Sequence, residues 1–181
     1  MTDTNPHHRI KHWMDALGIP ADYGQRHQLE PVAESANLIS IGQDLFGRDQ
    51  SMEPTAAKAW QNMQASAQKA GVVLQVVSAY RSIDYQAGLI QKKLDRGQTM
   101  DEILKVSAAP GFSEHHTGQA LDLTTVDCEP LEEAFADTDA YAWLMQHASE
   151  FGFVESFGKN NPHGLIWEPW HWCYRDFLIA A

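Results

Sequence analysis

Cysteine, basic residues and long apolar runs are scarce in this sequence, and each scarcity excludes a class of protein. The chain has only two cysteines in 181 residues, Cys128 and Cys173, so a disulfide framework is excluded and one disulfide bond is the most that could form. Its 13 Lys and Arg face 24 Asp and Glu, for a net charge of −11 at pH 7. Such a balance argues against a nucleic-acid partner, which needs a basic surface, and against docking on an anionic membrane.

The apolar segments are also too short for a membrane span or a visible export signal. No run approaches the roughly 20 apolar residues that cross a bilayer. The first eight residues are polar, and no apolar segment follows them. We therefore expect no membrane span, and a cytoplasmic location for the chain as given or a periplasmic one if an export signal has been removed.

The composition that is present fits a globular protein with a substantial core. Hydrophobic residues make up 44% of the chain and charged residues 20%, which is an ordinary balance for a folded domain. A length of 181 residues suffices for one core, and no repeat or low-complexity linker divides the sequence. We therefore predict a single domain over residues 1–181, in which residues 1–50 form an N-terminal helical extension.

Apolar residues recur at helical spacing in several segments. The clearest lies at 55–70, where Pro54 precedes the segment and Gly71 follows it, as is typical of helix ends. This periodicity predicts helices at 8–17, 55–70, 82–96, 100–106 and 138–150. The side chains expected to point inward from the segment at 82–96 are Tyr85, Leu89, Ile90 and Leu94.

Most strands are expected late in the chain. A β-branched run at 72–78 is typical of a buried strand. At 119–123 the residues alternate, so that Leu121 and Leu123 share one face and Asp122 lies on the other. Further strands are expected at 151–154 and 171–174, while residues 37–46 are expected to be extended or to turn. This order predicts an α+β fold with a small, mostly antiparallel sheet that carries the functional site on one face.

The stretch from Ser113 to Asp122 concentrates residue types that bind metals. His115 and Asp122 lie seven residues apart with Gly118 between them, and His171 follows near the C-terminus. Asp122 falls on the polar face of one predicted strand and His171 begins a later one, so the side chains could meet if the strands are neighbours. Three protein ligands and one open position are the pattern of catalytic zinc. The sequence therefore predicts one zinc ion per chain.

Glu168 and Arg81 are the candidate catalytic residues. Glu168 precedes His171 by three residues, and a carboxylate beside a metal can take a proton from water and give it to a leaving amine. Arg81 follows a predicted buried strand, where it could bind a substrate carboxylate or a developing oxyanion. Each residue alone also has a structural interpretation, and His116 competes with its neighbour for the ligand role. Their conjunction favours a metal-dependent hydrolase.

Three motifs resemble those of the VanY-type D-alanyl-D-alanine carboxypeptidases. These are zinc peptidases of the wider group that contains the lysostaphin-like enzymes and the Hedgehog signalling domain. The pattern Ser-x-His-x-x-Gly-x-Ala-x-Asp matches residues 113–122, and Glu-Pro-Trp-His matches 168–171. An upstream Ser-x-Tyr-Arg-Ser-x-x-x-Gln matches residues 78–86. The resemblance covers about residues 53–176, and three motifs in the right order are rarely met by chance.

This resemblance implies a fold, a substrate and a role for each matched residue. The implied fold is a small antiparallel sheet with helices packed on one side. The implied substrate is the D-Ala-D-Ala end of a peptidoglycan stem peptide, with free D-alanine as the product. The implied metal ligands are His115, Asp122 and His171, with Glu168 as the base and Arg81 orienting substrate or stabilising the oxyanion. The residues expected to contact substrate are Ser113, Gln86 and Trp170.

Related activities on the same site remain as alternatives. An L,D-carboxypeptidase, a D,D-dipeptidase or a cross-link endopeptidase, acting on stem peptides or muropeptides, would differ in the loops that close the groove, here 95–112 and 157–165. A non-catalytic zinc-bearing module that binds the cell wall should lack the base or the arginine, and this chain keeps both. A phage-type wall lysin would bring a basic wall-binding segment, against which the acidic balance argues.

Overall fold

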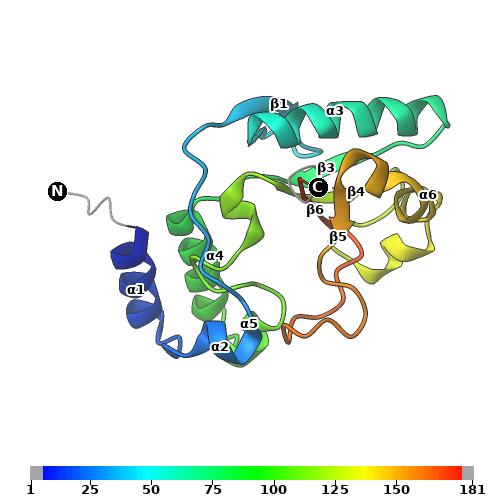
Figure 1. Cartoon of the computed structure of the whole chain (residues 1–181). Helices are drawn as coiled ribbons and strands as arrows, with labels where there is room; N and C mark the ends of the chain where they lie inside the picture. The colour runs from blue at the N-terminus through cyan, green and yellow to red at the C-terminus, as the bar shows by residue number, and fades with distance from the viewer. Residues whose placement is uncertain (1–5, 177–181) are drawn as a thin grey trace.

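Four short strands form one antiparallel sheet at the centre of the molecule (Figure 1). The computed structural model describes residues 6–176, and within them the sheet has the order β3–β4–β6–β5 with every neighbouring pair antiparallel. Its strands are β3 (Gln75–Ser78), β4 (Ala120–Thr124), β6 (His171–Tyr174) and β5 (Phe153–Glu155). The predicted α+β class is confirmed. Strand β3 begins later than expected: the Val72 N–H still bonds back to the Ala67 carbonyl of α3, and pairing with β4 begins only at Gln75.

The helices surround this sheet and follow the predicted segments closely. Their bounds are α1 (Pro6–Leu17), α2 (Tyr23–His27), α3 (Pro54–Lys69), α4 (Ile83–Asp95), α5 (Met100–Leu104) and α6 (Asp139–His147). Three short 3₁₀ turns add η1 (Glu114–Thr117), η2 (Glu133–Asp137) and η3 (Ala148–Phe151). The short helix α2 was not predicted. No helix in this part of the chain is long and apolar enough to cross a membrane.

Capping residues explain where the two longest predicted helices begin. The carboxylate of Glu53 accepts hydrogen bonds from the backbone N–H groups of Thr55 and Ala56, at 2.9 and 3.1 Å, and Pro54 occupies the first helical position of α3. The Ser82 hydroxyl accepts from the Tyr85 N–H at 3.0 Å at the start of α4. These local bonds fix the helix ends independently of the tertiary packing.

The N-terminal region is more varied than a helical extension. It carries α1 and α2, followed by a hairpin of β1 (Ile39–Gln43) with β2 (Asp49–Met52). The extended segment expected at 37–46 thus contains β1, whereas its partner β2 was not predicted because its residues show no apolar alternation. The single domain expected over residues 1–181 stays a prediction, and its first five and last five residues lie outside the described part.

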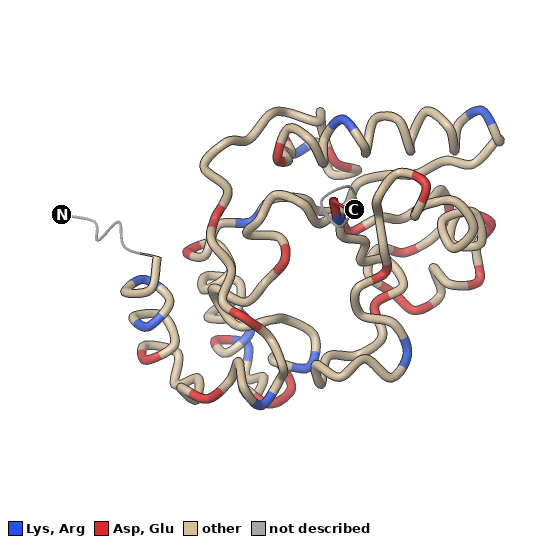
Figure 2. Tube along the Cα trace, viewed as in Figure 1, with Lys and Arg blue, Asp and Glu red and all other residues tan. Residues whose placement is uncertain are grey.

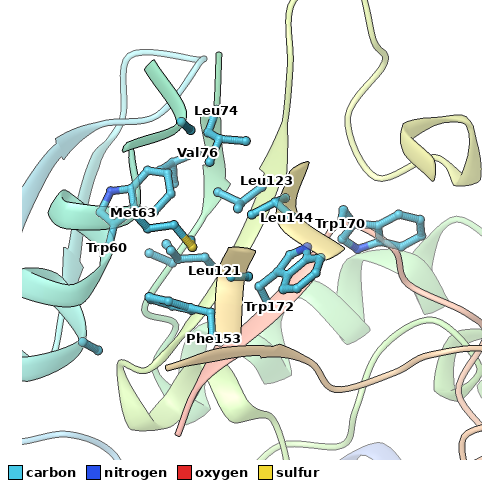
Figure 3. Close-up of a cluster of buried hydrophobic side chains, with 14 of the residues drawn as sticks. Trp60, Met63, Leu74, Val76, Leu121, Leu123, Leu144, Phe153, Trp170 and Trp172 are labelled. Carbon is cyan, nitrogen blue, oxygen red and sulfur yellow. The ribbon is translucent and has the colours of Figure 1, made fainter. Parts of the chain in front are cut away.

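One face of the sheet is apolar and carries the main hydrophobic core (Figure 3). Alternation along β4 sends Leu121 and Leu123 to this face, where both are fully buried. They pack with Trp60 and Met63 of α3 and with Leu144 of α6. Because alternate residues point to opposite faces, Asp122 must lie on the other face.

A second core forms between the helices on the polar side of that sheet. Ile10 and Met14 of α1 pack with Ile83 and Ile90 of α4 and with Ile103 of α5. The side chains of α4 that point into this core are only partly those that were predicted to point inward.

Tyr85, expected to point inward, is 50% exposed. The buried side chains of α4 are Ile83, Gln86, Ala87 and Ile90. A polar side chain, Gln86, occupies the buried face because it is hydrogen-bonded there, and apolar periodicity alone could not indicate this.

Charged residues are scattered along residues 6–176, and both cysteines are free. Figure 2 shows Lys and Arg scattered along the described chain, with Asp and Glu more frequent than either. Cys128 and Cys173 are both free thiols, so the one disulfide bond that the sequence left open is not formed. That nucleic acid is not a partner stays a prediction.

Candidate metal centre and active site

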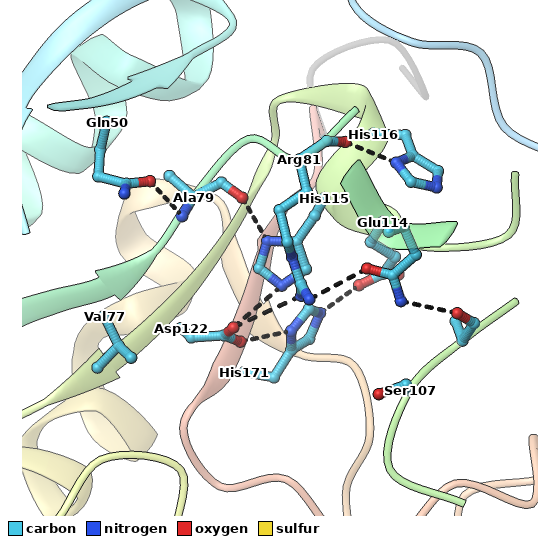
Figure 4. A network of polar contacts seen from close by, with 12 residues as sticks. Gln50, Val77, Ala79, Arg81, Ser107, Glu114, His115, His116, Asp122 and His171 are labelled. Atoms are coloured by element: carbon cyan, nitrogen blue, oxygen red, sulfur yellow. Dashed lines mark hydrogen bonds and ion pairs between the residues drawn. The ribbon is translucent and has the colours of Figure 1, made fainter. Parts of the chain in front are cut away.

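Two strands and one 3₁₀ turn bring His115, Asp122 and His171 together (Figure 4). Asp122 on β4 and His171 on β6 are direct partners across the strand pair. His115 lies in η1, immediately before β4. One candidate ligand atom from each side chain lies within 4.8 Å of the other two, and all three residues are buried. Neighbouring strands thus produce the cluster that the spacing of the motifs indicated.

Gly118 allows the chain to return from His115 to the sheet. Its φ of +71° lies in the left-handed region, and an added Cβ would lie 2.9 Å from the Glu53 backbone nitrogen. Only glycine fits this turn without displacing the backbone. The glycine of the motif therefore serves the geometry of the metal-binding loop.

The donor atoms of the three side chains lie close enough together to share one metal ion. His115 Nε2 lies 3.2 Å from Asp122 Oδ2, and His171 Nδ1 lies 3.0 Å from Asp122 Oδ1. Ligand atoms at zinc–ligand distances of about 2.0–2.1 Å lie roughly 3.3 Å apart in a tetrahedron. Two imidazoles and a carboxylate are also a zinc-type donor set. The residues present therefore fit the metal that the motifs imply.

An unsatisfied nitrogen on His115 supports the same conclusion. His115 Nδ1 is 2.5 Å from the Ala79 carbonyl oxygen, to which it can only donate. This contact leaves Nε2 as the nitrogen with a lone pair, and Nε2 is buried without a hydrogen bond. A buried polar atom without a partner costs about 1–3 kcal/mol. A cation bound at Nε2 would remove that cost.

In the metal-free cluster, the pKa values of the two histidines are shifted in opposite directions. Burial and then the charge of Arg81 lower the pKa of His115 to about 4. Burial would also lower the pKa of His171, but hydrogen bonds to Asp122 and Glu114 outweigh it and raise that pKa to about 10. Burial would raise the pKa of Asp122, yet the two histidines hold it well below its usual value. His115 is therefore neutral at pH 7, whereas a metal at His171 Nδ1 must displace a proton.

Glu114 is a functional candidate that the sequence analysis missed. Its Oε2 lies 2.8 Å from His171 Nε2, on the side of the ring opposite Asp122. Its other oxygen forms an ion pair with Arg175. Burial would raise the pKa of Glu114, but the hydrogen bond and charge of His171 hold it below its usual value. Metal-binding histidines usually donate their second N–H in this way, which fixes the ring and its tautomer. The only signal in the sequence is its place one residue before His115.

Replacing Glu114 by glutamine should therefore weaken zinc binding. The amide removes the negative charge that accepts the His171 N–H, and loss of such a partner typically weakens metal affinity by roughly 10–100-fold. Titration against a chromophoric chelator measures the change. Glu129→Gln, an exposed carboxylate outside the motif, is the matched control. An unchanged zinc affinity would show that Glu114 only pairs with Arg175.

His116, the competing ligand candidate, is used elsewhere. Its Nδ1 lies 2.6 Å from the Arg81 carbonyl oxygen, and its Nε2 accepts from the Gly111 N–H at 3.1 Å. Burial lowers its pKa to about 4, so it is neutral at pH 7. Both ring nitrogens are thus hydrogen-bonded to backbone groups. The alternative in which His116 replaces His115 as a metal ligand finds no support.

Arg81 lies against the cluster and is held by Gln86. Its Nη2 lies 3.6 Å from Asp122 Oδ2, and its Nη1 donates to Gln86 Oε1 at 3.2 Å. The Gln86 amide in turn donates to the Ala108 carbonyl at 2.8 Å. Gln86 therefore fixes the guanidinium against the loop after α5, with both ends of its amide engaged.

A small cavity of about 40 Å³ opens beside the three metal-binding residues. Glu168 lines it and is 9% exposed, and no protein group in residues 6–176 is recorded as a hydrogen-bond donor to its carboxylate. Burial raises the pKa of Glu168 to about 7. Ser113 also lines the cavity. The complete lining is Arg81, Gln86, Val106, Ser107, Ala108, Ser113, Glu114, His115, Phe157, Leu165, Glu168 and His171.

Trp170 does not join this group. It is 7% exposed and belongs to the main hydrophobic core, as Figure 3 shows. The residues of the cavity do not include it. The expected contact with substrate is therefore not supported, because the large indole is packed with apolar side chains instead.

The first of the two loops expected to close the groove, 95–112, contacts the chain directly after the second, 157–165. The Ile166 N–H donates to the Lys105 carbonyl at 2.9 Å, which joins the segment after α5 to the segment before Glu168. Both segments also contribute to the cavity, through Ser107 and Phe157. A sheet-borne His–Asp–His cluster beside a buried carboxylate, closed over by two loops, is the arrangement of a metallopeptidase.

The chain belongs to the VanY family of D-alanyl-D-alanine carboxypeptidases, whose model matches residues 49–177. A putative carboxypeptidase, YodJ, of Bacillus subtilis is 34% identical over 123 residues, which are 66% of this chain and 44% of the relative. A D-alanyl-D-alanine carboxypeptidase of Enterococcus faecalis is 27% identical over 67% of this chain and 47% of the relative. The chain thus spans about half the length of these two curated relatives.

Solved structures show the same fold. An L,D-carboxypeptidase, LdcB, matches 78% of this chain and 69% of its own with a TM-score of 0.70 and 30% identity. VanYB in complex with D-alanine-D-alanine matches 83% of this chain and 84% of its own, with a TM-score of 0.64 and 23% identity. A vancomycin-resistance D,D-pentapeptidase VanY in complex with Zn(II) matches 80% and 83%, with a TM-score of 0.62 and 24% identity. The last two likenesses bear on the fold alone.

Proposed function

We propose that this chain is a zinc-dependent carboxypeptidase that releases the C-terminal D-alanine from peptidoglycan stem peptides ending in D-Ala-D-Ala. The observation that carries the proposal is Glu168, a buried carboxylate that lines a small cavity beside three metal-binding side chains and accepts no hydrogen bond from residues 6–176. Membership of the VanY family supports the choice of substrate. The cavity has room for roughly three water-sized groups, which suits a small terminal residue such as alanine.

Each residue of the site has a defined task in this reaction. His115, Asp122 and His171 would hold zinc, which supplies a Lewis acid that polarises the peptide carbonyl and lowers the pKa of water. Glu168 accepts a proton from the attacking water and delivers it to the nitrogen of the departing D-alanine. Water oxygen adds to the carbonyl carbon, the C–N bond breaks, and the products are a shortened peptide and a free amine.

In this reaction Arg81 acts on the peptide substrate. Its guanidinium, fixed by Gln86, directs N–H groups toward the cavity, where charge develops on the carbonyl oxygen. Preorganised donors of this kind stabilise an oxyanion better than mobile ones, because they need no reorganisation during the reaction. The Ser113 hydroxyl is placed at the same cavity to contact the peptide.

The rate should fall as the pH drops below about 6, because both histidine ligands must be neutral to bind metal. The raised pKa of His171 means that protons compete for its Nδ1, so zinc affinity weakens by about tenfold per pH unit while one proton is displaced. Protonation of Glu168, whose pKa is raised to about 7 without metal, removes the base in the same direction. Rates and zinc affinities measured from pH 5 to 8 test this, and a flat rate from pH 7 to 5 would contradict it.

Product analysis tests the reaction and its specificity together. Zinc-loaded protein is incubated with a stem pentapeptide ending in D-Ala-D-Ala, with the matching tetrapeptide and with free D-Ala-D-Ala, and the products are weighed by mass spectrometry. We expect loss of one D-alanine from the pentapeptide, abolished by a chelator. Cleavage of no substrate by protein that holds zinc would refute the proposal.

L,D-carboxypeptidase activity is the second candidate, supported by the 30% identity to LdcB. The same zinc ligands and base would then cut the bond before the single D-alanine of the tetrapeptide. In the product analysis this activity appears as tetrapeptide cleavage with the pentapeptide intact. That result would keep the catalytic residues and change the assigned substrate.

A further inference from the structure

Helix α4 places a second cation beside the cavity. Lys93 follows Gln86 by seven residues, which is about two helical turns, so both side chains lie on the same side of α4. Gln86 donates to the Ala108 carbonyl, and the Lys93 ammonium donates to the Ser107 hydroxyl, each at 2.8 Å. Ser107 and Ala108 both line the cavity. Lys93 is therefore hydrogen-bonded to a residue that lines the cavity, although it is not itself part of the lining.

Within residues 6–176, the ammonium of Lys93 forms no ion pair with a carboxylate, although the chain has 24 acidic residues. It is half-buried. Burying a charge without a counter-ion costs free energy. An ammonium also has three N–H donors, and Ser107 occupies one of them. Lys93 thus has both the charge and the free donors to bind an anion.

Charges of the active site act directly on Lys93. Burial and then the nearby Arg81 lower the pKa of Lys93, while Glu168 raises it. The lysine is therefore within electrostatic range of the base and of the arginine. Neighbouring Lys92, by contrast, is exposed to solvent. An anion bound at Lys93 would give its ammonium a counter-ion at ion-pair distance.

We propose that the Lys93 ammonium and the Ser107 hydroxyl form the subsite that binds the α-carboxylate at the C-terminus of the peptide substrate. The proposal rests on the proposed function and adds the group by which the chain recognises a peptide end. The carboxylate accepts N–H bonds from Lys93 and an O–H bond from Ser107, whose oxygen already accepts from the lysine. Charge-assisted bonds of this kind are about twice as strong as neutral ones.

Placing the carboxylate there explains why the enzyme would remove one residue only. The carboxylate subsite lies at the wall formed by Ser107, and the base lies in the wall formed by Glu168. The cavity between them has room for roughly three water-sized groups. A single small residue therefore fills the space between the cleaved bond and the peptide end.

The competing interpretation is that Lys93 merely fixes the loop after α5 by bonding to Ser107. Two variants separate the interpretations, because they break the same hydrogen bond and differ in charge. Ser107→Ala removes the hydroxyl and keeps the ammonium, whereas Lys93→Met removes the ammonium and keeps much of the side-chain volume. If the loop contact is the only role of Lys93, both variants act alike.

Binding is measured by calorimetry in zinc-loaded Glu168→Gln protein, which cannot turn over the peptide. The ligands are a stem pentapeptide ending in D-Ala-D-Ala, as the free acid and as the C-terminal amide. With Lys93 present we expect the acid to bind roughly 10–100-fold more tightly than the amide, the effect of one hydrogen bond to a charged group. Lys93→Met should bind both forms about equally. Lys93→Arg, Ser107→Ala and the control Lys92→Met should keep most of the preference.

The outcomes separate the subsite from the function on which it rests. If Lys93→Met prefers the acid as strongly as the parent does, the subsite is refuted even though the peptide is bound. Weaker binding of acid and amide alike in both Lys93→Met and Ser107→Ala would identify a loop contact and also refute it. If the protein with Glu168 intact cleaves no peptide and the Glu168→Gln protein binds none, the proposed function itself fails.

Discussion

Glu168→Ala should lower the rate of D-alanine release by roughly 10²–10⁴-fold, the usual contribution of a general base, while zinc stays bound. The physical reason is the division of tasks in the cavity: Glu168 faces it, but the candidate ligand atoms belong to His115, Asp122 and His171. The zinc content should therefore be unaffected. Because burial raises the pKa of Glu168, its carboxylate is unfavourably placed in the folded protein, and its removal should not lower the melting temperature.

Three measurements test the Glu168→Ala prediction. Turnover is measured on the pentapeptide, zinc content by elemental analysis and melting by calorimetry, with Glu129→Ala as an exposed acidic control. A near-normal rate would exclude Glu168 as the base. Loss of zinc together with activity would instead make Glu168 a ligand, contrary to the geometry of the cluster.

Asp122→Ala should abolish both zinc binding and activity and also destabilise the metal-free protein. Asp122 contacts His115, His171 and Arg81, so its removal leaves positive charge buried without a partner. Breaking a buried ion pair from one side typically costs about 3–5 kcal/mol. Both variants should therefore lose activity, but only Asp122→Ala should also lose zinc and stability.

Urea unfolding of the metal-free proteins at pH 7 measures the destabilisation. Asp137→Ala, an exposed acidic residue, controls for the loss of one negative charge. If Asp122→Ala unfolds at the same urea concentration as the parent, the ion pairs around Asp122 contribute nothing to stability. If it still holds one zinc ion tightly, Asp122 is not a ligand.

The residues of the metal cluster could be predicted because local patterns carry them. Alternation along β4 determines that Asp122 and Leu121 face opposite sides, and the start of β6 at His171 follows from the same kind of pattern. The direct pairing of Asp122 with His171 needs only that β4 and β6 be neighbours. Spacing and strand periodicity were sufficient for these features.

Features that depend on contacts distant in sequence could not be predicted. Glu114 meets His171 across 57 positions of the chain, and no local pattern signals that pair. Lys93 looks like an ordinary solvent-exposed lysine near a helix end until the loop at Ser107 is placed against it. Tyr85 is exposed although it was expected to point inward, and Gln86 is buried because its amide is hydrogen-bonded to Ala108.

The residues of the site come from two parts of the molecule, and each part is packed in its own hydrophobic core. Both strand-borne members of the metal cluster, Asp122 and His171, belong to the sheet that rests on the first core. Gln86 and Lys93 belong to α4, which is packed in the second. Substitutions in α4 and the loop after it can therefore retune which peptide end is accepted while the metal geometry stays intact. Specificity in such a scaffold can evolve without passing through an inactive protein.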